Sequence, residues 1–265
     1  MSDARGDQPD QHAGRDADRQ ADNEATWLDA AAVERLGVQL GREPEPNRIA
    51  HERASDAVRR LIDVLHRCAA PAEAYEAVAT TVEGLVEDLG THPRLTTRGA
   101  FEHLASGSGD AAGGEALAPF SHFDLGALVG PLNAIAPPIH LRPTTSGVTG
   151  TVVFGDPYEG PPGHVHGGFV AAALDEVLGM AQGLSGRPGM TARLDVSYRR
   201  PTPLHRELEL GARIVSVRGR KITVEGEVRH DGEVTAEATG LFISVDFEAM
   251  RAAMAAAEAA GSGDG

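Results

Sequence analysis

Residues 160–182, GPPGHVHGGFVAAALDEVLGMAQ, decide the fold of this chain. The segment from Gly167 onward is rich in alanine and apolar on nearly every side, which is typical of a helix buried in a protein core rather than lying on its surface. The expected buried side chains are Phe169, Val170, Ala173, Leu174, Val177, Leu178 and Ala181. The Gly-Pro-rich residues before Gly167 predict a turn that leads into this helix.

Strand-like stretches lie on both sides of the helix in the sequence. One β-rich run precedes it, at residues 148–154. Apolar and polar residues alternate in four stretches after it, at 192–199, 208–214, 222–228 and 234–238. Alternation with a period of two predicts strands with one buried face and one solvent-exposed face. We therefore expect an α+β fold in which a curved antiparallel sheet wraps around one long central helix.

Two turns divide the strands that follow the helix. The segment His230-Asp231-Gly232-Glu233 contains Asp-Gly, which tolerates positive φ and predicts a hairpin turn. The segment from Ser216 to Arg220 predicts a second turn.

The rest of the chain divides by composition. Residues 1–26 are almost free of apolar side chains and are expected to be disordered. A helical extension is expected at 27–104, with an antiparallel helical pair at about 47–90 that starts its second helix after Pro71 and ends it near Gly90. A flexible linker at 105–119 leads to the main domain at 120–247, and 248–265 predict a short helix and a disordered tail. The pair is expected to cover another surface; covering the substrate tunnel, extending an oligomer interface and docking a partner all stay open.

Charge and composition exclude several classes of function. The formal net charge of −15 argues against a protein that binds nucleic acid or an anionic membrane. The single cysteine, Cys68, excludes an intrachain disulfide and a cysteine-rich metal site. No apolar run is long enough to cross a bilayer, and the N-terminus lacks the apolar region of a signal peptide, so we expect a cytoplasmic protein.

The negative charge is concentrated outside the strand-rich part of the chain. Residues 138–246 hold 13 acidic and 11 basic residues, a net charge of −2. An anionic ligand is therefore compatible with this part of the chain.

Three features together resemble the hotdog-fold acyl-CoA thioesterases, in the phenylacetate-pathway (PaaI-like) branch of the 4-hydroxybenzoyl-CoA thioesterase superfamily. They are the segment GPPGHVHGG at 160–168, Asp175 nine residues after His166, and the segment TARLDVSYRRPTPL at 191–204. The similarity covers roughly residues 120–247. It implies hydrolysis of acyl-CoA thioesters to free acid and coenzyme A, with no cofactor beyond the substrate's own coenzyme A.

The resemblance assigns roles at the start of the helix. It implies that the Gly167 N–H polarises the thioester carbonyl, which agrees with the unpaired donors and the positive dipole at a helix N-terminus. Gly168 is expected to lie beside the substrate, and His166 to shape the loop through hydrogen bonds of its ring. The alternative is that the two glycines only make a tight turn. Some relatives carry an asparagine six residues before this histidine, where this chain has Gly160, so that role is unfilled unless Tyr158, Glu159 or His164 takes it.

Asp175 is the strongest candidate for the chemistry. A carboxylate in the middle of an apolar helix is costly to bury, and burial would raise its pKa. The resemblance implies that it acts as nucleophile or as the general base that activates water. The alternative is a solvent-facing Asp175 beside Glu176, which we expect to be structural or at the rim. Thr191 is implied to hold the water or the carboxylate, although strict alternation would place it on the face of Arg193 and Asp195, away from the core.

Helix geometry predicts a site shared between two subunits. Gly167 and Asp175 are eight residues apart, which is about 12 Å along a helix and about 80° around it. A thioester needs both groups within about 3 Å of its carbonyl. One helix cannot easily supply both, but two antiparallel helices related by a two-fold axis can, which agrees with the family's dimer-interface sites. We expect a homodimer or a dimer of dimers, and an inactive monomer.

Basic residues are candidates for the phosphates of coenzyme A. They are Arg199 and Arg200, and the turn cluster Arg218, Arg220 and Lys221. The turn cluster is the better candidate because it has no adjacent acid, although solvated hairpin ends remain an alternative. His164 and His166 lack a third ligand at motif spacing, so no metal is expected. The alternative function is a non-catalytic module that binds acyl-CoA as a sensor or regulator.

Overall fold

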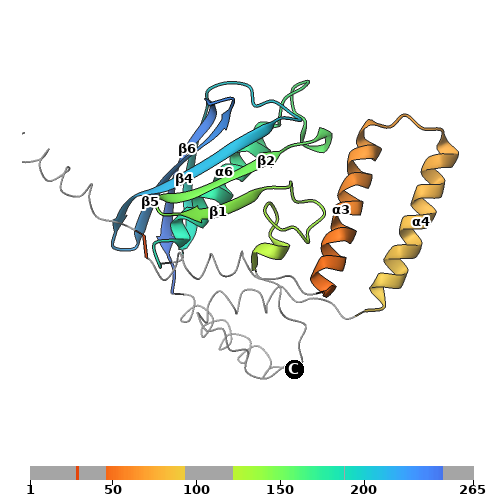
Figure 1. Cartoon of the computed structure of the whole chain (residues 1–265), viewed down its shortest axis with the longest axis horizontal. Helices are drawn as coiled ribbons and strands as arrows, with labels where there is room; N and C mark the ends of the chain where they lie inside the picture. The colour runs from red at the N-terminus through yellow and green to blue at the C-terminus, as the bar shows by residue number, and fades with distance from the viewer. Residues whose placement is uncertain (1–27, 30–45, 93–121, 188, 247–265) are drawn as a thin grey trace, which may run out of the picture.

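The structure is a computed structural model that describes residues 28–29, 46–92, 122–187 and 189–246. Its main body is one antiparallel sheet with strand order β1-β2-β4-β5-β6-β3, curved around a central helix, α6 (Figure 1). This arrangement confirms the α+β fold expected from the sequence. The strands are β1 (His140–Thr144), β2 (Gly147–Val153), β3 (Gly189–Tyr198), β4 (Glu207–Arg218), β5 (Lys221–His230) and β6 (Glu233–Ser244).

Helix α6 (Gly167–Gly183) lies against the inner face of the sheet and forms the centre of the core. Its predicted buried residues are buried, except that Phe169 is only partly so. Strand residues of the inner face pack against the helix, and Phe154 and Phe242 are among the largest fully buried side chains. Gly226 brings a strand close to the helix, because a Cβ there would lie 3.2 Å from the Leu178 side chain.

The two predicted turns are confirmed. Asp231 and Gly232 have φ values of 49° and 77° between β5 and β6, as an Asp-Gly hairpin requires. Gly219 has φ 59° at the turn between β4 and β5.

Strands β1 and β3 form the two edges of the sheet. Most residues of β3 are exposed, and its outward edge is unpaired among the described residues. The pairing of β3 with β6 shifts register between Thr191 and Arg193, so Ala192 is an extra residue in the strand. Such a bulge reverses the alternation of side chains on its N-terminal side.

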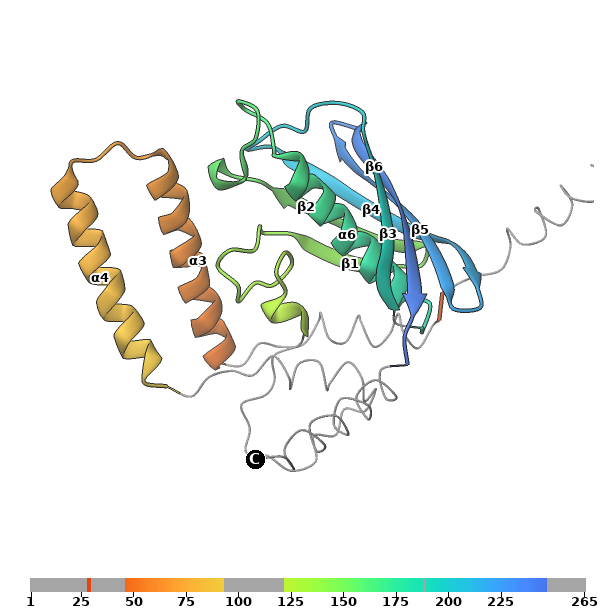
Figure 2. The same ribbon diagram turned by 180° about the vertical axis from the view of Figure 1, so that it is seen from behind.

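Two helices precede the sheet, α3 (Pro46–Arg67) and α4 (Ala72–Gly90), and both were predicted. Helix α3 attaches to the body through polar side chains: Ser55 donates to the Leu132 carbonyl at 2.8 Å, and Arg48 bonds Asp124 at 2.8 Å. Helix α4 lies on the far side of α3 and has no buried residue (Figure 2). Helix α4 therefore covers no other element that the structure describes, and what the pair covers stays a prediction.

The expected tail at 1–26, the linker at 105–119 and the C-terminal segment at 248–265 lie outside the described residues, as does nearly all of the segment from 27 to 45. None of the helices that the structure describes is long and apolar enough to cross a membrane.

Candidate active site

The N-terminus of α6 presents a backbone donor that has no partner among the described residues. His166 is the N-cap residue, and its Nδ1 accepts a hydrogen bond from the Gly168 N–H at 3.0 Å. The next donors in the first turn, at Phe169 and Val170, bond the His166 carbonyl. The Gly167 N–H bonds no residue that the structure describes. It is therefore free to bind an oxygen atom at the positive end of the helix dipole.

The loop before α6 is fixed by its own backbone hydrogen bonds. The Gly160 N–H donates to the His164 carbonyl at 2.9 Å, and the His166 N–H donates to the Tyr158 carbonyl at 2.8 Å. A Cβ at Gly160 would lie 2.7 Å from the His166 Cα. This loop conformation therefore has no room for a side chain where some relatives carry asparagine.

The three residues that could replace that asparagine are all engaged locally. Tyr158 is buried and donates to the Ile135 carbonyl at 3.2 Å. Glu159 accepts from the Gly163 N–H at 2.6 Å, and the His164 ring lies 2.9 Å from the Pro162 carbonyl oxygen. Their contacts explain how the loop holds its shape, and none of them reaches Gly167.

Tyr198, which the sequence analysis did not assign to the site, contacts its centre. Its hydroxyl donates to the Gly167 carbonyl at 2.8 Å, and its ring would lie 3.4 Å from a Cβ at Gly167. The Tyr198 ring therefore packs directly against this position, at an ordinary van der Waals distance from a Cβ placed there. The available signal was the alternation of β3, which places Tyr198 on the same face as Leu194 and Val196.

Asp175 and Thr191 meet at a second point along α6. The Thr191 hydroxyl donates to Asp175 Oδ1 at 3.0 Å. Strict alternation would have placed Thr191 on the opposite face of β3, so that expectation is wrong. The extra residue Ala192 turns Thr191 toward the helix, opposite Phe242, which belongs to the buried face of β6.

The two neighbouring carboxyls of α6 differ from expectation. Asp175 is half-buried in the single chain rather than buried. Its neighbour Glu176 was expected at the rim, but burial raises the pKa of Glu176, and the nearby Asp175 charge raises it further. Glu176 is thus partly desolvated, and it has no hydrogen bond to a described residue.

The arginine candidates separate into two groups. Arg199 and Arg200 follow Tyr198 directly, but they form ion pairs with Glu237 and Glu233. These salt bridges reduce their availability for phosphate.

The turn cluster lies at the other end of β3, because Lys221 pairs with Ile243 of β6 and Met190 of β3 pairs with the same residue. Arg220 donates to the Ser244 carbonyl at 3.0 Å, and neither Arg218 nor Lys221 forms an ion pair with a described residue. Within one chain, the site residues at Gly167 and the turn cluster are therefore not brought together.

No group of three or more potential metal ligands occurs among the described residues. The ring nitrogens Nδ1 of both candidate ligands are used in the loop, at His164 for the Pro162 carbonyl and at His166 for the helix cap.

Comparison with known proteins places these residues in a family context. Residues 162–237 match the thioesterase superfamily. The chain is 39% identical over 97 residues to the acyl-coenzyme A thioesterase THEM4 of Bos taurus, covering 36% of this chain and 40% of that protein. It is 36% identical over 92 residues to the Mus musculus THEM4, covering 34% and 40%. The chain thus spans about two-fifths of the length of these curated relatives.

A solved structure extends the similarity over a larger share of the chain. The crystal structure of a thioesterase superfamily protein is 37% identical, with a TM-score of 0.61. The match covers 73% of this chain and 94% of that one.

Proposed function

Because this chain belongs to the thioesterase superfamily, we propose that it hydrolyses acyl-CoA thioesters to the free acid and coenzyme A. The observation that carries the proposal is a pair of groups on α6. The Gly167 N–H is a donor at the helix N-terminus that bonds none of the described residues, and the Asp175 carboxylate, held by the Thr191 hydroxyl, lies two turns further along.

Each group suits one part of thioester hydrolysis. Attack on the carbonyl carbon places negative charge on the carbonyl oxygen, and the Gly167 N–H at the positive end of the helix stabilises that charge. As a general base, Asp175 takes a proton from the attacking water. The tetrahedral intermediate then collapses, the carbon–sulfur bond breaks, and the coenzyme A thiolate leaves and takes up the proton. As a nucleophile, Asp175 would instead form an anhydride that water hydrolyses; the same carboxylate serves both routes.

The active site is formed by two subunits in this proposal. Gly167 and Asp175 are about 12 Å apart along α6, and each has its own contact on β3, at Tyr198 and at Thr191. A two-fold axis beside α6 would bring Gly167 of one subunit to Asp175 of the other. The exposed, unpaired edge of β3 is compatible with a partner at this side of the sheet. A homodimer is therefore the smallest active unit, and an active monomer in a sedimentation-coupled assay would contradict this.

Gly168 and His166 shape the donor site for the thioester carbonyl. The bond from the Gly168 N–H to His166 Nδ1 fixes the first turn and leaves Gly167 as the exposed donor. For the coenzyme A phosphates, Arg218 and Lys221 are the better candidates, because Arg199 and Arg200 are neutralised by glutamates. Arg220 has a further donor group besides the one used for Ser244.

The test is thiol release from a panel of acyl-CoAs that differ in chain length and in aromatic or aliphatic character. We expect release by the wild type and a loss of at least about 100-fold in kcat for Asp175→Asn, with acyl-CoA binding retained. Asp195→Asn is the matched control, because Asp195 pairs with Arg193 on the outer face of the same sheet. The control should keep wild-type release.

The main alternative is a non-catalytic module that binds acyl-CoA. Tight acyl-CoA binding without release on any chain length would favour that alternative over hydrolysis. The panel of acyl-CoAs also shows directly which acyl group the protein prefers. The cytoplasmic location expected from the sequence stays a prediction.

A further inference from the structure

Helix α4 carries an apolar row that nothing in the described part of the chain covers. The row, which we call the α4 row, repeats at spacings of three and four and consists of Tyr75, Val78, Val82, Leu85 and Leu89. A spacing of this kind places all members on one side of a helix, as in helices that pair with other helices. Yet α4 has no buried residue.

The row becomes more exposed with distance from the turn between α3 and α4. Val82 is 37% exposed, Leu85 55% and Leu89 69%. At the turn itself, the Tyr75 hydroxyl donates to the Cys68 carbonyl at 2.6 Å and accepts from the Ala70 N–H at 3.1 Å. The two helices are thus tied at the turn, and α3 of the same chain leaves Leu85 and Leu89 uncovered.

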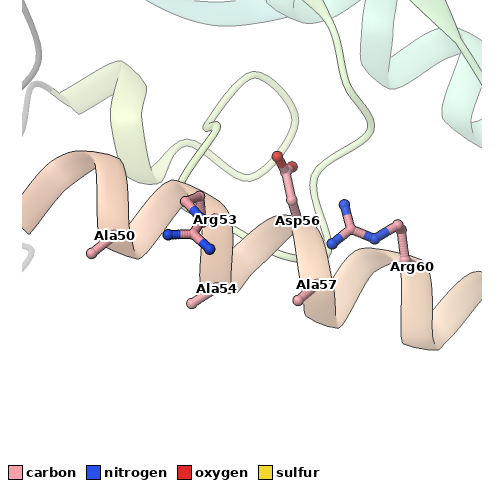
Figure 3. Close-up of a pocket in the computed structure, with 6 residues that line it drawn as sticks. All are labelled: Ala50, Arg53, Ala54, Asp56, Ala57 and Arg60. Carbon is pink, nitrogen blue, oxygen red and sulfur yellow. The ribbon is translucent and has the colours of Figure 1, made fainter.

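Helix α3 has a complementary surface on its outer side. Ala50, Ala54 and Ala57 lie along a shallow hollow, with Arg53 and Arg60 beside them (Figure 3). These two arginines form no ion pair with a described residue. They are not needed to attach α3 to the body.

The attachment of α3 uses a different row of residues. Arg48 bonds Asp124, Ser55 bonds the Leu132 carbonyl, and Arg59 bonds the Ala136 carbonyl at 3.0 Å. The alanine hollow and its two arginines therefore remain available for another helix.

The charges of the two helices are opposite. Helix α4 carries five acids and no base, whereas α3 carries five bases and three acids. None of the five α4 acids forms an ion pair with a described residue. They are Glu73, Glu76, Glu83, Glu87 and Asp88. Small side chains on α3 leave space for the large leucines of the α4 row, and the two arginines beside the hollow are opposite in charge to Asp88, which borders that row.

We propose that the α3–α4 hairpin binds the same hairpin of a second copy of this chain, with α4 of each copy lying on the alanine hollow of α3 of the other. Leu85 and Leu89 fill the hollow, and Asp88, which borders the row, lies near Arg53 and Arg60. The contact is made twice around a two-fold axis, so it is self-complementary and closed. The absence of any base on α4 argues against an anionic membrane as the occupant.

This contact is separate from the proposed catalytic dimer. Helix α3 attaches to residues 124–136 and to the turn after β2, whereas the free edge of β3 lies at the other end of the strand order (Figure 2). A chain that uses both contacts would form a dimer of dimers. The second of these contacts, the catalytic dimer, rests on the proposed function. The hairpin contact itself is tested by mass alone, so its failure and a failure of thioesterase activity can be told apart.

The first experiment measures the mass of the full chain by sedimentation equilibrium. We expect the double variant Leu85→Glu/Leu89→Glu to have half the wild-type mass, with unchanged helix content by circular dichroism. Thr80→Glu is the matched control, because it adds a charge to the opposite side of α4, and it should keep the wild-type mass. Equal masses for the wild type and the double variant would overturn the proposal, since the row would then be covered within one chain or not at all.

The second experiment uses charge exchange between two proteins. One carries Arg53→Glu/Arg60→Glu and the other Asp88→Arg. Each alone should have half the wild-type mass, and an equimolar mixture should recover the full mass, because both contacts in the mixed pair are again between opposite charges. Closure of α4 on its own α3 would not be rescued by mixing. A mixture that does not gain mass would therefore overturn the proposed contact between the hairpins of two copies.

Discussion

The Thr191 hydroxyl donates to Asp175 Oδ1 at 3.0 Å, and this bond joins the edge strand β3 to the central helix α6. The bond depends on one extra residue, Ala192, which turns Thr191 toward the helix. A donor at this oxygen fixes the rotamer of the carboxylate and leaves its other oxygen for water. Thr191 is therefore a positioning residue in the proposed reaction.

Thr191→Val should lower kcat about 10- to 100-fold, which corresponds to the loss of one hydrogen bond to a charged group of ~1.5–3 kcal/mol. KM should change little, because the side chain acts through Asp175 and is not expected to bind coenzyme A. Steady-state kinetics on the best substrate of the panel measures both. Thr191→Ser keeps the hydroxyl and should restore most of kcat; equal losses in the valine and serine variants would rule out a role for this hydrogen bond.

Tyr198→Phe tests the second contact of β3 with the helix. The hydroxyl bonds the Gly167 carbonyl, so its removal should loosen the first turn of α6 and the donor on Gly167. A neutral hydrogen bond of this kind contributes ~0.5–1.5 kcal/mol, so kcat/KM should fall about 2- to 10-fold. The ring stays in place in this variant, and the melting temperature should change by only a few degrees. An unchanged kcat/KM would show that the loop alone fixes the donor.

Most of the sheet and the core helix could be predicted from the sequence, because alternation and apolar content act locally. The position of Thr191 could not, since a bulge depends on the pairing of β3 with β6 and leaves no mark in the pattern of β3. The contact of Tyr198 with Gly167 could not be predicted either, because the two residues are 31 positions apart in the sequence and meet only in the folded chain. The apolar row of α4 was read correctly as a helix face, but periodicity alone does not say what lies against that face.

The loop before α6 makes a prediction about stability. Gly160→Ala places a Cβ 2.7 Å from the His166 Cα, a backbone atom that cannot move without shifting the helix cap. We expect a loss of ~1–3 kcal/mol in the free energy of unfolding, together with lower activity. Gly183→Ala is the matched control, because a Cβ at the end of α6 meets nothing within 4 Å and should stabilise the helix by up to ~1 kcal/mol. Urea unfolding measures both; equal stability of the two variants would contradict the crowding at Gly160.

Glu176 makes a prediction about pH, because burial and the neighbouring Asp175 raise its pKa in the folded chain above the ordinary value of 4.5. A carboxyl whose pKa is higher in the folded than in the unfolded state favours folding while it is protonated. That contribution is fully present below the unfolded pKa and is lost as the pH rises through the folded pKa. Glu176→Gln stays neutral at every pH, so it should be more stable than the wild type at pH 7, and the difference should shrink toward pH 4. Urea unfolding of both proteins from pH 4 to pH 8 measures this difference. Asp195→Asn provides the comparison for an exposed carboxylate with an arginine partner, where no such gain at neutral pH is expected. The difference in unfolding free energy between Glu176→Gln and the wild type should not be equal at pH 4 and pH 8. An equal difference would show that the Glu176 carboxyl is solvated in the folded chain.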